Sequence, residues 1–563
     1  MSEAAEHAVV VIGAGPSGLA LAIELGSRGV DCLLVERNDR VGYAPRAKTT
    51  NVRTRTHLRR WGIADKLASV APFGIDYPSD VKFVTRLGGF GLATIENASN
   101  CAPARNDFYP EHGQWVPQYK LEQVLREHAE TLPSVRIVFN TAFKSADQSA
   151  DGVDVVLEDV TDGTERRVSC RYLVGGDGAR SAVRDLIGAT MSGKYGLSRN
   201  YNIVFRAPGL ARAHPHGQAT MYWQVNPAAP SLIGPMDEDD LWFFMPTRLP
   251  EGFTITRENA ATLIREATAI DLSYEIRSSD EWVASSLIAD RYRQGGVFLI
   301  GDACHLHPPF GGYGMNMGVA DGVDLGWKIA AVLQGWGGPA LLDSYETERR
   351  AIHEEVIAEA AANHAVLSND FWSEGLETPG EDGDALRAAV GKRIYAAKER
   401  EFHTLGTVLG GCYAASPIIA TEPAPAAPGG GDARVYEPSS RPGCLAPHAW
   451  RADASSLYDA FGKGFALLCR PDADPADARR AVAEASAQGE PLVVVDLSVD
   501  EAADRYPCSL TLVRPDQFVA WRGNSWAEGI LAFAAGWDRL AGSHPSEDRK
   551  SPTSLERQPE RAS

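Results

Sequence analysis

The segment from Gly301 to Asn316 concentrates side chains and turns that could hold a polar ligand. It contains an aspartate, two histidines, two prolines and a glycine-rich turn, and an apolar strand (Val297 to Ile300) comes before it. Apolar positions at one-turn spacing predict that a helix follows. A carboxylate at a strand end, then a glycine-rich turn and a helix N-terminus, offer backbone N–H donors and the positive end of a helix dipole. This chemistry suits a flat polar ring that gains negative charge.

A glycine fingerprint near the N-terminus lies between two predicted strands. Gly13, Gly15 and Gly18 follow the apolar run 8–12, a helix is predicted next, and the second strand ends at Glu36. In such a motif the first glycine permits the tight turn, the second lets a pyrophosphate approach the backbone, and the third allows close helix–strand packing. A carboxylate about 20 residues on takes ribose hydroxyls and disfavours a 2′-phosphate. The unit therefore predicts that NAD or FAD, rather than NADP, binds at this fingerprint.

A third motif begins at Asp177 and follows the apolar run 172–174. By itself this segment is equally consistent with a plain strand-to-helix turn in which Ser181 lies near a helix start. Taken in order, however, the three motifs resemble those of the class A flavoprotein monooxygenases. These are FAD-dependent aromatic hydroxylases of the para-hydroxybenzoate hydroxylase and phenol hydroxylase type. The resemblance covers about residues 8–365.

The resemblance implies an α/β fold and a redox activity. It predicts a Rossmann-like FAD domain split around a β-sheet substrate domain, with a thioredoxin-like domain at the C-terminus. The implied enzyme binds FAD noncovalently, takes electrons from NADPH or NADH, and uses O2 to hydroxylate a phenolic or polyketide-type aromatic small molecule through a flavin C4a-hydroperoxide. Two alternatives stay open: epoxidation or Baeyer–Villiger oxygen insertion on a polycyclic substrate, and a flavin-binding protein without catalysis.

The resemblance also carries over individual residues. It assigns cofactor contacts to Gly13, Gly15, Gly18, Glu36, Arg37, Arg46, Gln118, Asp177, Asp302, Pro309, Gly311, Gly312, Met315 and Asn316. Tyr222 and Trp223, on a predicted strand, are candidates for substrate contact together with Pro309, although a plain sheet core explains both aromatic residues equally well. No family motif names a catalytic base, so the catalytic residue is unknown and Tyr222 is a candidate for it. His305 and His307 adjoin the aspartate of the first motif, and structural hydrogen bonding is the expected role of His305.

Composition narrows the classes of partner. The chain has 563 residues and a net charge of −19, with no basic stripe, which argues against nucleic acid as a partner. No run approaches the ~18 apolar residues needed to span a bilayer, and no N-terminal signal segment is present, so we expect a cytoplasmic protein without a membrane partner. The eight cysteines are scattered without a CxxC pair, which argues against a bound metal and against a dithiol redox pair of that type.

Composition and element order divide the chain into several parts. The predicted parts are an FAD-binding domain (1–185 and 285–345) around a β-sheet substrate domain (186–284), a helical excursion (346–421), a linker (422–433), a thioredoxin-like domain (434–542) and a disordered tail (543–563). The helical excursion could form a homodimer contact or simply pack against the flavin domain. Without a CxxC pair, the C-terminal domain is expected to be structural or oligomer-forming, and Pro507 is predicted to be the cis-proline of the thioredoxin fold.

Overall fold

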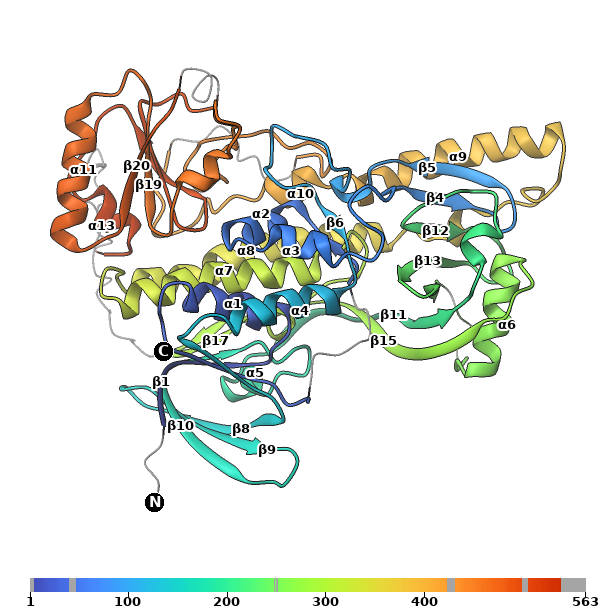
Figure 1. Cartoon of the computed structure of the whole chain (residues 1–563), viewed down its shortest axis with the longest axis horizontal. Coiled ribbons are helices and arrows are strands. Elements are labelled where there is room, and N and C mark those ends of the chain that lie inside the picture. Colours follow the sequence, from blue (N-terminus) through green and yellow to red (C-terminus); the bar gives the residue numbers. More distant parts are fainter. Residues whose placement is uncertain are drawn as a thin grey trace, which may run out of the picture.

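The computed structural model describes residues 5–39, 47–247, 249, 252–422, 431–498 and 505–537. Arg46, most of the predicted linker and the predicted tail lie outside the described residues. Within the described chain, two eight-stranded sheets and one four-stranded sheet surround a long central pair of helices (Figure 1). No described helix is both long and apolar enough to cross a membrane.

The first large sheet is mainly parallel and carries the glycine fingerprint. Its strands follow the order β16-β17-β10-β1-β2-β7, with β9 and β8 as an antiparallel extension of β10. The bounds are β1 Ala5–Ile12, β2 Cys32–Val35, β7 Val135–Val138, β8 Thr141–Gln148, β9 Val153–Asp159, β10 Glu165–Gly175, β16 Arg293–Gln294 and β17 Val297–Leu299. Because β1, β10 and β17 run parallel, the three sequence motifs that follow them meet at the same edge of the sheet.

Two buried helices, α1 (Pro16–Gly26) and α7 (Gly314–Leu333), lie against each other over this sheet. Gly318 and Gly322 leave one face of α7 without side chains, at a spacing of one turn. A Cβ at Gly318 would lie 2.2 Å from the Ser17 Oγ, and a Cβ at Gly322 would lie 2.7 Å from the Ser17 carbonyl oxygen. The two helices therefore pack backbone to backbone, which fixes their N-terminal ends relative to the sheet.

The second large sheet is mixed, and its two faces pack against different helices. Its order is β18-β15-β11-β14-β13-β12-β4-β5. The bounds are β4 Val81–Val84, β5 Gly91–Ile95, β11 Met191–Arg206, β12 Met221–Gln224, β13 Ser231–Asp237, β14 Leu241–Pro246, β15 Glu275–Ala289 and β18 His305–Leu306. One face packs on α6 (Arg257–Thr268), and the other packs on α9 (Glu381–Phe402) and on Phe310, in the loop before α7. The second face is rich in aromatic side chains and borders that loop.

Further helices and a short ribbon complete the framework around the two large sheets. Their bounds are α2 Val52–Arg60, α3 Ala64–Ser69, α4 Gln118–Ala129, α5 Ala182–Leu186, α8 Ala340–His364, α10 Leu405–Leu409, β3 Thr49–Thr50 and β6 Gln114–Trp115. Helix α8 runs beside α7 and forms the central pair with it (Figure 1).

The C-terminal unit runs from Gly443 to α13. It contains a four-stranded sheet of order β20-β19-β21-β22 with helices beside it, and the Gly443 N–H donates to the Val519 carbonyl at the start of β22. The bounds are β19 Phe465–Cys469, α11 Pro475–Gln488, β20 Leu492–Asp496, β21 Leu510–Val513, β22 Val519–Gly523 and α13 Ile530–Ala534. The predicted cis bond at Pro507 is wrong, because the described chain has no cis peptide bond. The trans isomer is favoured by about 0.5–1 kcal/mol. Here Arg470 donates to the Tyr506 carbonyl and the Tyr506 hydroxyl donates to the Pro447 carbonyl, which holds the segment in place.

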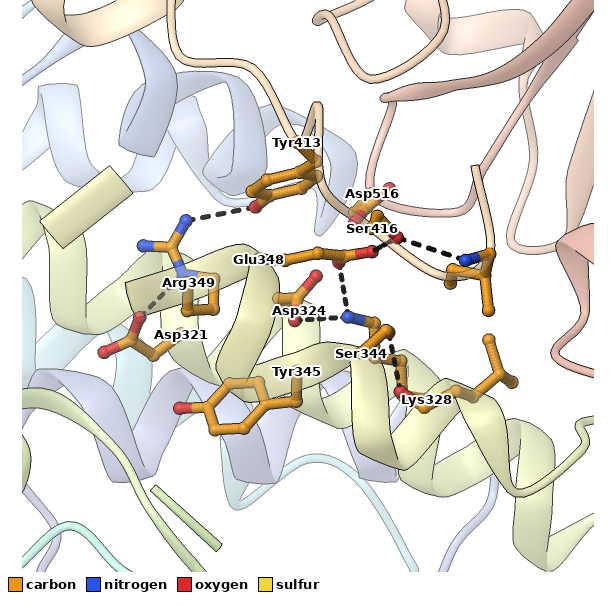
Figure 2. Close-up of polar contacts among 12 residues, drawn as sticks. Asp321, Asp324, Lys328, Ser344, Tyr345, Glu348, Arg349, Tyr413, Ser416 and Asp516 are labelled. Atoms are coloured by element: carbon orange, nitrogen blue, oxygen red, sulfur yellow. Dashed lines mark hydrogen bonds and ion pairs between the residues drawn. The ribbon is translucent and has the colours of Figure 1, made fainter. Parts of the chain in front are cut away.

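A buried ionic cluster joins the C-terminal unit to α7 and α8. Arg514, directly after β21, donates to Glu348 of α8 at 2.6 and 2.8 Å and to Asp516 at 2.5 Å. Lys328 of α7 donates to Glu348 at 2.5 Å and to Asp324 at 2.8 Å (Figure 2). All five side chains are buried. We call them the docking cluster, because one of its cations comes from the C-terminal unit.

Candidate active site

The fingerprint loop between β1 and α1 ends at an open helix N-terminus. Gly13 has a φ of +101°, and a Cβ there would lie 2.3 Å from the Gly176 carbonyl oxygen, so only glycine allows this approach. A Cβ at Gly18 would lie 2.0 Å from the Gly13 carbonyl oxygen, whereas a Cβ at Gly15 would meet nothing within 4 Å. No side chain caps the N-terminus of α1. Its backbone N–H groups therefore face a space without side chains, which suits a pyrophosphate.

The acid at the end of β2 is held against this loop. Glu36 accepts the Ala14 N–H at 3.0 Å, and its other oxygen accepts the Asn38 side chain at 2.6 Å. These bonds keep the carboxylate beside the fingerprint, where the sequence predicts a ribose contact. Arg37, the next predicted contact, is exposed.

The carboxylate of Asp177 is used by the turn in which it lies. It accepts the Ser181 hydroxyl at 2.5 Å and the Ala182 N–H at 2.8 Å, and Ser181 caps α5. The plain-turn interpretation therefore accounts for this side chain. The motif still contributes backbone to the site, because Gly176, next to Asp177, lies against Gly13 of the fingerprint. A nucleotide contact by Asp177 stays a prediction.

The buried carboxylate of Asp321 anchors the loop after β17. Asp302 is exposed, and the Gly301 N–H just before it donates to Asp321 of α7 at 2.9 Å. Asp321 also accepts a hydrogen bond from His305 at 2.8 Å. Figure 2 shows a further bond to Asp321, from Arg349 of α8 at 2.8 Å. His305 thus has the structural hydrogen bonding that the sequence predicts for it.

Four buried side chains make up this anchor, Asp321, Arg349, His305 and His353, and we call them the loop cluster. Burial works to raise the pKa of Asp321, but His353 and Arg349 hold it well below its ordinary value. Burial lowers the pKa of His353 to about 3, with His305 contributing. Asp321 and Arg349 thus form a buried ion pair, and both histidines lie within hydrogen-bond distance of the same carboxylate.

The turn before α7 leaves a second helix N-terminus open. This turn and the first turn of the helix contain Pro309, Gly311, Gly312, Met315 and Asn316. Tyr313 occupies the N-cap position without a side-chain cap hydrogen bond. The Asn316 side chain bonds to backbone beside the helix end: it donates to the Gly312 carbonyl at 2.8 Å and accepts the Asn51 N–H at 3.0 Å. Asn316 thus shapes the turn with its side chain, and the backbone donors near Met315 are left to meet an anionic ring edge.

Further hydrogen bonds connect the segment after Arg46 to α7 and to α4. Asn316 donates to the Thr49 carbonyl at 3.0 Å, and Gln118, at the start of α4, accepts the Ala47 N–H at 3.1 Å. Thr49 and Ala47 belong to the segment directly after Arg46. The residues present therefore fit a bound FAD, with one open helix N-terminus for the pyrophosphate and another for the pyrimidine edge of the ring.

The two aromatic candidates on β12 point to opposite faces of the second sheet. Tyr222 packs on the α6 side and donates its hydroxyl to the Gly217 carbonyl, and burial raises its pKa. These contacts favour the sheet-core explanation for Tyr222 over catalysis. Trp223 lies on the other face, where its ring centre is 5.9 Å from that of Phe310, the residue after Pro309. Trp223 is therefore the one of the two that borders the loop before α7.

Sequence reasoning missed Lys48. Its ammonium group lies 3.8 Å from the centre of the Phe243 ring, on the same face of the second sheet as Trp223. The next residue, Thr49, is tied to α7 through Asn316. Burial lowers the pKa of Lys48 to about 8. A single lysine two positions after Arg46 forms no recognisable sequence motif. Only its place between the turn before α7 and the second large sheet distinguishes it.

The chain matches two protein-family models. Residues 6–360 match the FAD binding domain family, and residues 439–538 match the C-terminal domain of aromatic-ring hydroxylases. The chain belongs to the FAD-dependent aromatic-ring hydroxylases. A curated relative of this hydroxylase is the tetracenomycin B2 monooxygenase-dioxygenase of Streptomyces olivaceus, 33% identical over 557 residues that cover 94% of this chain and 98% of the relative.

Solved structures share the fold of this hydroxylase over almost its whole length. The rebeccamycin biosynthetic enzyme RebC with reduced flavin has a TM-score of 0.86 at 32% identity, covering 95% of this chain and 100% of that chain. A ternary complex of aklavinone-11 hydroxylase with FAD and aklavinone has a TM-score of 0.79 at 31% identity, with coverage of 95% and 100%. The predictions of a flavoprotein family, an α/β fold with an FAD-binding domain, FAD as cofactor and monooxygenase activity are confirmed.

Proposed function

We propose that this monooxygenase hydroxylates a phenolic, polyketide-type polycyclic molecule, with NADPH or NADH as the reductant and O2 as the oxygen source. The observation that supports this most directly is the open N-terminus of α7 beside an aromatic face of the second sheet. Bound FAD would supply the reductive activation of O2 and the transfer of one oxygen atom to an electron-rich carbon. The names of two relatives, which refer to tetracenomycin B2 and aklavinone, support the substrate class.

The chain's own residues would prepare the site in two ways. The N-terminus of α7 would stabilise negative charge at the ring edge, an effect worth up to ~2 kcal/mol when partly buried. Trp223 packs on Phe83 with ring centres 5.5 Å apart and on Phe310. This apolar wall would keep water away from the reacting atoms, which strengthens every electrostatic interaction beside it.

Lys48 is proposed to meet a phenolic oxygen of the substrate. Its ammonium lies on the aromatic face, and its backbone neighbours are tied to α7 and α4. In apolar surroundings a cation stabilises a phenolate, whose ring carbons are more electron-rich than those of the neutral phenol. Because burial lowers the pKa of Lys48 to about 8, this group can also exchange a proton near neutral pH.

The proposal is tested on the purified protein. It should show the absorption spectrum of oxidised flavin, release FAD on denaturation, and oxidise NADPH or NADH faster when a fused-ring phenol is added. A product with one additional hydroxyl group supports the proposal. A lactone would replace it by Baeyer–Villiger insertion, and an epoxide would replace it by epoxidation. If no phenolic polycycle stimulates the oxidation of either nucleotide, the substrate class is wrong.

A homodimer is a further part of the proposal. Tyr395 on α9 is 40% exposed and Trp372, in the segment before α9, is 42% exposed, so apolar surface is available on the helical excursion. Light scattering of the FAD-loaded protein should then give twice the chain mass of 60.6 kDa. A monomer mass at micromolar concentration would contradict the dimer and leave the catalytic proposal unaffected.

A further inference from the structure

Cys412 and Cys444 lie opposite each other where the segment after α10 meets the C-terminal unit. Their sulfur atoms are 3.3 Å apart, and the two residues form an isolated antiparallel bridge. The Tyr413 N–H donates to the Gly443 carbonyl at 2.8 Å, so the cysteines face each other at a non-hydrogen-bonded position of this bridge. Cα atoms at such positions are about 4.5 Å apart, which lies within the range that a disulfide spans.

The backbone around the pair keeps the two sulfur atoms in contact. Gly443 has a φ of +90°, and a Cβ there would lie 3.2 Å from the Cys412 Sγ, so a side chain would both strain the turn and crowd the sulfur. The Val519 N–H of β22 donates to the Cys444 carbonyl at 2.9 Å, which anchors Cys444 to the C-terminal sheet. Closing the S–S bond would shorten the gap between the sulfur atoms by about 1.3 Å.

We propose that Cys412 and Cys444 are a redox modification site, at which a reversible intrachain disulfide locks the C-terminal unit onto the segment after α10. Cys412 is partly exposed and Cys444 is buried, so a small oxidant reaches the pair from the Cys412 side. In reducing compartments, disulfides are usually of this transient kind. The absence of a CxxC motif does not bear on this site, because its two cysteines are 32 positions apart.

The oxidant is hydrogen peroxide, which is reduced to water while the two thiols are oxidised to a disulfide. The hydrogen bond from the Cys412 thiol, with Ser439 and Arg441 contributing, lowers the pKa of Cys444 although burial opposes this. The Cys444 thiolate attacks one oxygen of hydrogen peroxide, the O–O bond breaks, and the departing hydroxide takes up one thiol proton to leave as water. The Cys412 sulfur then attacks the sulfenic sulfur, the S–S bond forms, and the second thiol proton leaves in a second water. Two thiols and one peroxide become one disulfide and two waters.

The disulfide would act on a contact between two parts of the molecule. Tyr413, next to Cys412, stacks on Phe518 of the C-terminal unit with ring centres 4.2 Å apart. Its hydroxyl also accepts a hydrogen bond from Arg349 of the loop cluster at 3.1 Å (Figure 2). Oxidation would therefore restrain the position of Tyr413 between the C-terminal unit and the loop cluster, and would raise the unfolding temperature.

The test uses the full-length, FAD-loaded protein and hydrogen peroxide, followed by peptide mapping without reduction. The expected product is a peptide pair linked through Cys412 and Cys444 and about 2 Da lighter than its two thiol forms together. Dithiothreitol should reverse the link, and the oxidised protein should unfold several degrees higher. Cys508→Ser is the matched control, because Cys508 is also partly exposed, and this variant should form the same link. In Cys412→Ser, Cys444 should instead accumulate as a sulfenic acid that dimedone labels.

Three results would overturn the proposal. One is oxidation of Cys508 at peroxide concentrations that leave the pair reduced. Another is conversion of either paired sulfur to a sulfinic acid before any disulfide forms. The third is a linked pair whose unfolding temperature equals that of the reduced protein. If Cys412→Ser does not fold, the mapping of the unmodified chain decides the question by itself.

Discussion

The central helices α7 and α8 carry two buried ionic clusters that are built differently. In the loop cluster the carboxylate of Asp321 and the guanidinium of Arg349 both come from this helix pair. In the docking cluster three carboxyl groups share two cations, and one of these, Arg514, comes from the C-terminal unit. The loop cluster is balanced by the helices alone, whereas the docking cluster needs a partner from outside them. The chain thus anchors the loop after β17 locally and uses buried charge to hold its C-terminal unit in place.

The pKa values of the docking cluster follow from its surplus of carboxyl groups. Burial raises the pKa of Asp324 to about 8, and the charges of Glu348 and Asp516 act in the same direction. Burial also works to raise the pKa of Glu348, but Arg514 and Lys328 lower it to about 2. Asp324 is therefore the group that takes up a proton, and with that proton the cluster is neutral.

Removal of Arg514 should be the most damaging change. Arg514→Met keeps an apolar side chain of similar length but leaves the buried carboxyl groups with Lys328 as their cation in the docking cluster. We expect a loss of about 3–5 kcal/mol in the free energy of unfolding, measured by urea denaturation. Arg479→Met is the matched control, because Arg479 is exposed on α11, and its effect should stay within about 0.5 kcal/mol. If the two changes lowered the free energy of unfolding equally, Arg514 would contribute no more to stability than an exposed charge does.

Asp321→Asn tests the loop cluster in the same way. The amide keeps the shape of the side chain but leaves the Arg349 guanidinium buried without its carboxylate, which costs about 3 kcal/mol. It also weakens the anchor of Gly301, so we expect the dissociation constant for FAD to rise at least ~10-fold, about 1.4 kcal/mol. Fluorescence titration with FAD measures this. Asp343→Asn, at a 69% exposed carboxylate on α8, is the control. Unchanged FAD affinity in Asp321→Asn would show that the anchor does not position the loop.

The pH dependence of stability should separate the two kinds of carboxyl group. The raised pKa of Asp324 means that its contribution is complete below the ordinary value of 3.8 and is lost as the pH rises toward about 8. The lowered pKa of Glu348 means the opposite, a contribution present above 4.5 that is lost as the pH falls toward about 2. We expect the native protein to lose about 1–3 kcal/mol between about pH 6 and about pH 9 through Asp324, and Asp324→Asn to lose less. Urea titrations of both proteins at both pH values test this. Equal losses of stability in the native protein and in Asp324→Asn would contradict it.

Lys48→Met should have the smallest effect, and it acts on rate instead of stability. The carboxylates of the clusters help to raise the pKa of Arg349 and Arg514, whereas burial lowers that of Lys48 to about 8. We expect kcat to fall about 10-fold at neutral pH, with the limb near pH 8 lost from the pH–rate profile. FAD affinity should not change, and Lys48→Arg should keep the charge but lose that limb. A change in KM alone would assign Lys48 to binding and not to the phenolate.

Local pattern predicted the strand–turn–helix units well and the second large sheet only in part. The sequence predicts a strand from Asn200 to Ala207, between turns that contain proline and glycine, but β11 begins at Met191 and pairs along β15. Side chains in the first half of β11 are largely exposed, as Tyr195 is at 76%. A strand formed by backbone pairing without a buried face leaves no hydrophobic period to detect. The trans bond at Pro507 was likewise outside what local pattern determines.

The amino-acid sequence by itself determined the two helix N-termini without side-chain caps and the space beside the fingerprint glycines, because a tight turn depends on the residues next to it in the chain. Only the tertiary structure decided which side of the sheet Trp223 occupies, that Arg514 reaches Glu348 from 166 positions away, and that Cys412 meets Cys444. The physical reason is that a buried charge or thiol interacts with whatever long-range packing brings against it, and the one-dimensional pattern around each residue does not record that partner.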